Sequence, residues 1–152
     1  MRFRLDVVPT TTTAQHKGVF VANGRVRFYT KAEVRRAESV LAALLAPHRP
    51  AQPFAVPLYV EIGWTFPYRK SERRSVVRSG ASIPHDTRPD LDNLEKSMLD
   101  VLTRMGFWLD DSLVAVKRTS KRRGPRPGID IAIEALPGGA ANFFTRGVAA
   151  TR

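Results

Sequence analysis

The sequence predicts an α+β fold: a single domain in which a mixed β-sheet carries an N-terminal hairpin and packs against two main helices. Segments with the two-residue alternation of strands are interspersed with two segments that have the 3.6-residue spacing of helices. No internal repeat divides the 152 residues, and 43% of them are hydrophobic, which is enough for one core.

The strands are expected where apolar and polar residues alternate. Residues 3–7 show this pattern, and the strongest alternation, over residues 58–66, predicts the central strand of the sheet. An Asn-Gly pair at residues 23–24 predicts a hairpin, because both positions of a two-residue turn take positive φ. Two later strands are expected, one beginning near residues 113–116 and one covering residues 129–135.

Two helices are expected between these strands. The first begins at a capping box in residues 30–33 and ends before Pro47. The second is expected over about residues 93–105, because Asp92 and Glu95 repeat the arrangement of a cap and its partner three residues later.

The remaining segments lack periodicity. Residues 67–89 are rich in Pro, Gly and Arg and predict a long mobile basic loop, for which a solvated linker is the plain alternative. Residues 121–128 predict a cationic turn, and a flexible C-terminal tail is expected over residues 137–152. The domain itself is therefore expected to cover residues 1–136.

The composition narrows the classes of function. Cysteine is absent, which excludes disulfides and thiolate zinc sites. The N-terminus lacks an apolar signal region and no segment has the length of a membrane span, so a cytoplasmic protein without a membrane partner is expected. The formal net charge of +11 favours a polyanionic partner, of which nucleic acid is the commonest large example.

Half of the acidic residues gather in one part of this basic chain. Seven of the 14 Asp and Glu residues lie between residues 86 and 111. Like charges repel one another unless a cation intervenes, and a divalent metal is such a cation. Asp90 and Asp92 stand at the start of the second helix, with Lys96 one turn further on. If the helix packs against the strand that follows, Asp111 is expected to lie close to Asp90 and Asp92, so that three carboxylates surround one point.

Such an oxygen-rich site favours Mg²⁺ or Mn²⁺ and phosphoryl chemistry. These ions bind phosphate oxygens and activate water, while Lys96 can neutralise charge on the scissile phosphate. On spacing alone, a structural interpretation is equally good: Asp92 caps the helix, Glu95 is its partner, and Asp110-Asp111 form a turn.

The residues around these acids resemble the signature of a known family. The stretch Arg88-Pro-Asp-Leu-Asp-Asn-Leu-Glu-Lys96, continued by Gly106-Phe-Trp-Leu-Asp-Asp-Ser112, is similar to that of the RusA family of Holliday-junction resolvases. The order of the expected elements fits the family as well. The resemblance implies a RusA-like fold and a homodimeric, Mg²⁺-dependent endonuclease that makes paired nicks in four-way DNA junctions during recombination and repair.

The resemblance also implies roles for individual residues. Six residues match positions of the family's motif. The match implies that Asp90, Asp92 and Asp111 are catalytic metal ligands, that Lys96 is the catalytic lysine, and that Asn93 and Asp110 are supporting residues. The early segment at residues 10–17 departs from the family, which has a Pro- and Lys-rich run there.

Basic residues of the loop, of the turn at 117–126 and of the hairpin are the expected DNA contacts, made with phosphates and weakened by salt. They are Arg69, Lys70, Arg73, Arg74, Arg78, Arg88, Lys117, Arg118, Lys121, Arg122, Arg123, Lys17, Arg25 and Arg27. Two other functions fit the same sequence: a noncatalytic basic DNA-binding protein whose acids are caps and turns, or a metal-dependent nuclease for other branched nucleic acids.

Overall fold

The computed structural model describes residues 1–11, 17–22, 25–30 and 32–136. The strands are β1 (Arg2–Leu5), β2 (Lys17–Ala22), β3 (Arg25–Thr30), β4 (Leu58–Phe66), β5 (Ile83–Pro84), β6 (Val114–Arg123) and β7 (Gly128–Ala135). The helices are α1 (Ala32–Leu45), α2 (Arg74–Ser79) and α3 (Leu91–Arg104), with short 3-10 turns η1 (Ala46–His48) and η2 (Asp111–Leu113).

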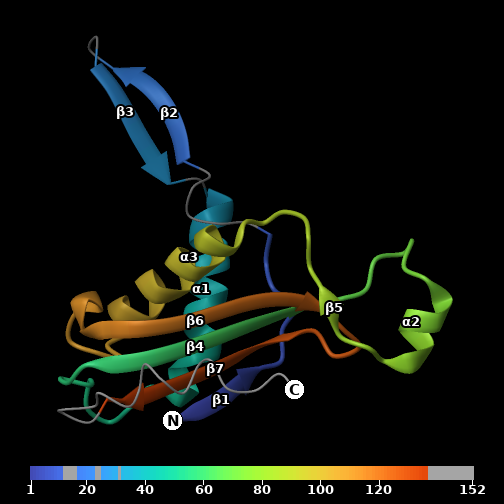
Figure 1. Ribbon diagram of the computed structural model, residues 1–152. Helices are drawn as coiled ribbons and strands as arrows, with labels where there is room; N and C mark the ends of the chain where they lie inside the picture. Colours follow the sequence, from blue (N-terminus) through green and yellow to red (C-terminus); the bar gives the residue numbers. More distant parts are fainter. Residues whose placement is uncertain (12–16, 23–24, 31, 137–152) are drawn as a thin grey trace.

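The centre of the fold is a five-stranded mixed sheet in the order β1-β7-β4-β6-β5 (Figure 1). Strands β4 and β6 pair in parallel. The other three pairs, β1 with β7, β4 with β7 and β5 with β6, are antiparallel. The predicted α+β fold is therefore confirmed, and residues 58–66 form the middle strand as predicted.

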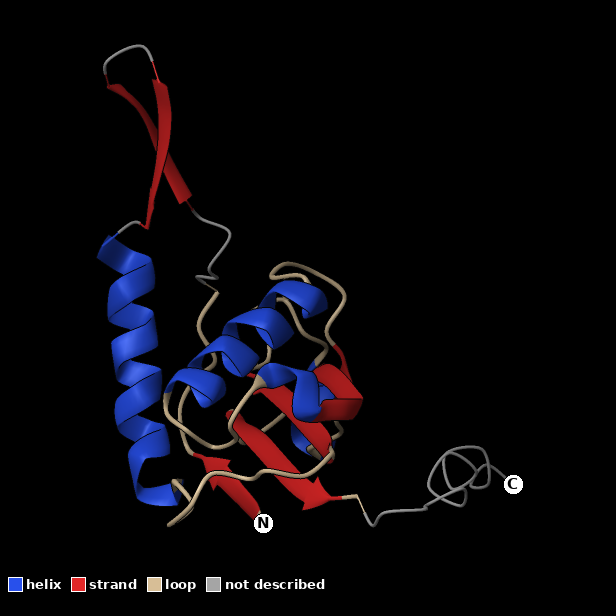
Figure 2. Cartoon of the chain, turned by 90° about the vertical axis from the view of Figure 1, so that its left-hand side faces the viewer, coloured by secondary structure: helices blue, strands red, loops and turns tan. Residues whose placement is uncertain are grey.

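The core lies between one face of this sheet and the helices α1 and α3. Alternate residues of β4 are buried there, including Trp64 at 2% exposure, together with the isoleucines of β7. Leu45 of α1 and Met98 of α3 belong to the same buried cluster. Figure 2 shows the helices in blue beside the strands of the sheet in red. The apolar spacing in the sequence thus fixes which face of each element is buried.

The hairpin of β2 and β3 stands apart from the sheet, beyond the N-terminal end of α1 (Figure 1). Its pairing runs from Lys17 with Thr30 to Ala22 with Arg25, so the predicted hairpin is confirmed. Its turn at residues 23–24, the complete capping box at 30–33 and the predicted tail at 137–152 lie outside the described residues.

Helix α3 ends in a Schellman motif. The amide of Gly106 donates to the carbonyl of Thr103 at 2.9 Å, and the amide of Phe107 donates to the carbonyl of Leu102 at 3.1 Å. Gly106 has φ of 74°, a conformation that glycine adopts without steric cost. This closure turns the chain sharply back toward the start of β6.

Two predictions about irregular segments are wrong. Residues 67–89 contain the helix α2 and the strand β5, which pairs with the end of β6. Residues 121–123 belong to β6 and not to a cationic turn, because parallel pairing with β4 continues as far as Phe66 and Arg123. Among the described helices, none has the length and apolar character needed to cross a bilayer.

Candidate active site

The acidic segment forms the N-terminal turn of α3. The helix begins at Leu91 with Asp90 as its N-cap, so the predicted start at residue 93 and the predicted cap at Asp92 are wrong. Asp90 is extended, with φ of −69° and ψ of 146°, which is the usual backbone conformation of an N-cap residue. Asp90 and Asp92 are both exposed, and the N-terminal end of a helix favours negative charge.

Asn93 supports Asp90 from within the same turn. Its Nδ2 donates to Oδ2 of Asp90 at 3.5 Å, while its own Oδ1 is buried and makes no hydrogen bond to any described residue. The side-chain oxygens of Asp90, Asp92 and Asn93 are therefore hard ligands that can still coordinate a cation, and such ligands suit Mg²⁺ or Mn²⁺. The donor chemistry fits the predicted metal.

Asp111 lies toward the opposite end of α3. Trp108 is bonded to the last turn of the helix, where its Nε1 donates to Oγ1 of Thr103 at 2.7 Å. Asp111 follows three residues later and can be at most about 10 Å from Trp108. The 14 residues of α3 extend about 20 Å between that end and Asp90.

The predicted convergence of Asp111 with Asp90 and Asp92 in one chain therefore does not occur. Across the part of the chain that the structure describes, no three His, Cys, Asp or Glu side chains form a group that could hold a metal ion. The reason is the short connection after Gly106: β6 runs back along α3 and starts where the helix ends.

Two further predicted site residues are exposed. Lys96 lies one helical turn after Asp92, where residues four apart are neighbours on the surface. Asp110 is the N-cap of η2, and its Oδ1 accepts from the amide of Ser112 at 2.9 Å. Hydrogen bonds from the side chain and then the backbone of Ser112 lower the pKa of Asp110. Asp110 thus orders the turn that carries Asp111.

Alternate side chains of β6 face α3 and the segment that leads into it. We call Lys117, Thr119, Lys121 and Arg123 the β6 donor row. Lys117 forms an ion pair with Glu95, and Oγ1 of Thr119 donates to the same carboxylate at 3.0 Å. Glu95 therefore serves the contact with β6 and not the predicted helix cap.

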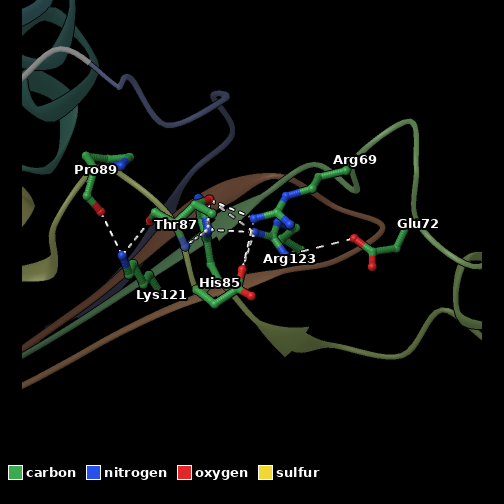
Figure 3. A network of polar contacts seen from close by, with 8 residues as sticks. Arg69, Glu72, His85, Thr87, Pro89, Lys121 and Arg123 are labelled. Atoms are coloured by element: carbon green, nitrogen blue, oxygen red, sulfur yellow. Dashed lines mark hydrogen bonds and ion pairs between the residues drawn. The ribbon is translucent and has the colours of Figure 1, made fainter.

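The donor row continues along the segment before Asp90 (Figure 3). Nζ of Lys121 donates to the carbonyls of Thr87 and Pro89, at 2.8 and 2.7 Å. Arg123 is only 4% exposed, and its Nη2 donates to Nδ1 of His85 at 3.0 Å and to Oδ1 of Asp86 at 2.9 Å. Lys121 and Arg123, both predicted to contact DNA, bond to groups of the protein itself, and of the two Arg123 is buried whereas Lys121 is half-buried.

His85 is buried in this network and is neutral there. A guanidinium can only donate, so Nδ1 of His85 must accept the bond from Arg123. Burial, followed by the positive charges of Arg123, Lys121 and Arg69, lowers the pKa of His85. The hydrogen bond from Arg123 is also the main cause of a lowered pKa at Asp86.

Acid is therefore expected to destabilise the fold through His85. The unfolded imidazole titrates near 6.5 and the folded one at lower pH, so the unfolded chain takes up the extra proton first. The stability contributed by neutral His85 is complete above that unfolded value and is lost as the pH falls through the folded pKa. In His85→Asn, which keeps an acceptor for Arg123, Tm should fall less steeply between about pH 7.5 and about pH 5. Equal slopes in thermal unfolding would refute this role.

The other predicted DNA contacts divide into two groups. Lys70, Arg73, Arg74, Arg78 and Arg88 are exposed and form no ion pair with any described residue. Several of them belong to α2 or flank it, and this helix lies outside the sheet beyond β5 (Figure 1). Free cations on a protruding element are suited to phosphate contacts.

The remaining group is occupied or not described. Arg69 bonds to Asp86 at 2.9 Å at 41% side-chain exposure. On the face of the sheet away from the helices, Arg118 lies 3.8 Å from Glu61 and Arg122 lies 3.0 Å from Asp130. The side chains of Lys17, Arg25 and Arg27 on the hairpin lie outside the described residues.

Sequence reasoning missed the network of His85, Asp86 and Thr87. The signal that could have found its partners was the continuation of the alternation in β6, which sends Lys121 and Arg123 to one face and Arg122 to the other. A basic run of this kind resembles a solvated turn unless it is recognised as a strand.

The chain is similar in sequence to known proteins. The chain matches the family described as Endodeoxyribonuclease RusA over residues 9–134. It is 29% identical over 131 residues to a crossover junction endodeoxyribonuclease of Lactococcus phage r1t, covering 86% of this chain and 93% of the relative.

Shorter matches are closer in sequence. Over 45 residues the chain is 49% identical to the crossover junction endodeoxyribonuclease of Escherichia coli O139:H28 and 47% identical to that of Enterobacteria phage 82. Each alignment covers 30% of this chain and 38% of the relative. Because the family match covers residues 9–134, from the segment after β1 almost to the end of β7, this chain belongs to the RusA family of endodeoxyribonucleases.

Proposed function

We propose that this chain resolves four-way DNA junctions by hydrolysing phosphodiester bonds in two opposed strands. The observation that carries the proposal is the pair of exposed carboxylates, Asp90 and Asp92, on an anchored helix turn in a chain of the RusA family. The relatives named above are crossover junction endodeoxyribonucleases. DNA as substrate also supports a cytoplasmic location, where the DNA of bacteria and their phages is found.

Mg²⁺ is the proposed cofactor, with Mn²⁺ as a substitute. Asp90, Asp92 and Asp111 would hold it, with Asn93 supporting Asp90 through their hydrogen bond. When bound, the ion supplies Lewis acidity for hydrolysis of the phosphodiester. Lys96, one turn from Asp92, would neutralise the charge on the scissile phosphate.

A homodimer completes the proposed site. Asp111 lies toward the opposite end of α3 from Asp90 and Asp92, so one chain holds two separated parts of a three-carboxylate site. In a two-fold dimer, Asp90 and Asp92 of one subunit can meet Asp111 of the partner subunit, and symmetry forms two such sites at once. Two sites are what paired nicks require.

The DNA would be held by cations that the fold leaves free. Arg73, Arg74 and Arg78 on or beside α2 are exposed and form no ion pair with a described carboxylate. The network of Arg69, Glu72 and Arg123 connects the base of this segment to the residues before Asp90 (Figure 3). Contacts of α2 with phosphates would therefore be made close to the scissile strand.

The test is a comparison of substrates with the full-length protein and Mg²⁺. A synthetic four-way junction should be nicked symmetrically in two strands, and a replication fork, a linear duplex and an RNA–DNA hybrid should be cut much more slowly. Preferential cutting of the linear duplex would contradict junction resolution. Tight junction binding without cleavage in Mg²⁺ or Mn²⁺ would instead identify a noncatalytic DNA-binding protein.

A further inference from the structure

The N-terminal turn of α3 is held by β6 on both sides of the acidic pair. On one side, Lys121 bonds the carbonyl of Pro89, the residue immediately before Asp90. On the other side, Lys117 and Thr119 bond the carboxylate of Glu95. Asp90 and Asp92 thus lie between two attachment points that belong to the same rigid strand.

Lys121 is the residue of the donor row with the most direct effect on this geometry. Its ammonium has three donors, and two of them bond carbonyls of the otherwise irregular segment that leads into α3. Arg123 extends the same restraint to His85, Asp86 and Thr87. No side chain of the donor row needs to touch DNA or metal for these contacts to fix the position of Asp90.

We propose that Lys121 is a positioning residue that orients Asp90 and Asp92 for binding the metal ion, through the carbonyls of Thr87 and Pro89. The inference rests on the proposed function of the two aspartates as metal ligands. Residues that orient metal ligands commonly contribute about 10- to 100-fold to metal affinity. Lys121 acts here through the backbone of the ligand and not through its side chain.

The positive charge of Lys121 and its proposed positioning of Asp90 have opposite effects on metal affinity, so the two roles can be separated by experiment. A cation close to two carboxylates repels Mg²⁺ or Mn²⁺, so an electrostatic role alone predicts that Lys121→Met binds metal more tightly. A positioning role predicts weaker binding, by about tenfold or more. A purely structural role predicts a lower Tm with unchanged metal affinity.

The experiment is a titration of the full-length protein with Mn²⁺ alone, followed by the electron paramagnetic resonance signal of the free ion. Lys121→Met should bind Mn²⁺ about tenfold more weakly than the wild type. Lys121→Arg, which keeps the charge and can still donate to both carbonyls, should bind nearly as the wild type does. Lys121→Gln, a neutral donor, should be intermediate and serves if the Met variant does not fold.

The matched control is Arg104→Met at the other end of α3. It also removes one positive charge and one bond of similar length, the 3.1 Å ion pair with Glu38, and it should leave Mn²⁺ binding unchanged. Unchanged or tighter binding by Lys121→Met, with binding lost in Asp90→Asn, would overturn the positioning role and leave the proposed metal site intact. Unchanged binding in Asp90→Asn would overturn the metal site itself.

Discussion

Asp92→Asn will abolish Mg²⁺-dependent nicking of a four-way junction while leaving junction binding intact. The substitution removes one negative charge from the exposed first turn of α3, which the helix does not use as its cap. Loss of a charge-stabilising group at a reacting centre typically lowers the rate by about 10²- to 10³-fold. The measurements are single-turnover cleavage and a gel shift of the junction without divalent metal. Cleavage at the wild-type rate would exclude Asp92 from catalysis.

Mixing two inactive variants tests where the third carboxylate comes from. Asp111→Asn is expected to be as inactive as Asp92→Asn. If each site takes Asp111 from the partner subunit, a heterodimer of the two variants contains one site with all its carboxylates, and nicking of one strand returns. If each site is built from one chain, both sites of the heterodimer stay defective. No recovery after subunit exchange would therefore reject the shared site, whereas full activity of Asp111→Asn alone would remove Asp111 from it.

The largest expected effect on stability is that of Trp108→Ala. Trp108 is 1% exposed, its Nε1 bonds Thr103, and its neighbour Phe107 is fully buried. Truncating a buried tryptophan to alanine costs about 3 to 5 kcal/mol of unfolding free energy, because it removes buried apolar area and leaves a cavity. Urea unfolding followed by circular dichroism would measure the loss.

The adjacent residue provides the control for this variant. Leu109 is 67% exposed, so Leu109→Ala should change the free energy of unfolding by no more than about 0.5 kcal/mol. Trp108→Phe, which keeps most of the apolar contact but loses the hydrogen bond to Thr103, should cost about 1 kcal/mol. A loss in Trp108→Ala no greater than that in Leu109→Ala would show that the turn before η2 is not part of the core.

Most of the fold could be predicted because its elements have an uninterrupted period. The alternation over residues 58–66 gave the middle strand with its correct bounds, and the isoleucines of residues 129–135 gave its neighbour β7. The segments α2 and β5 were missed, since six helical residues and two strand residues are too short to establish a period. The basic end of β6 was missed because charged residues on both faces hide the alternation.

The candidate site was predictable only in part, for a geometric reason. The acidic residues and their spacing are visible in the sequence, but the direction in which β6 runs along α3 is not. That direction separates Asp111 from Asp90 and brings Lys117, Thr119 and Lys121 to the acidic turn. The same limit applies to the cations: spacing alone does not distinguish Arg123, which is buried, from Arg78, which is exposed.

The placement of acidic residues toward both ends of α3 has a consequence for control. Under the proposed pairing, one chain carries two half-sites and no complete site, so an isolated subunit cannot cleave DNA. Nuclease activity then rises with the square of the protein concentration well below the dimer dissociation constant, and both incisions become available together. The separation of the acidic residues along one helix would in this way make nuclease activity depend on dimer formation.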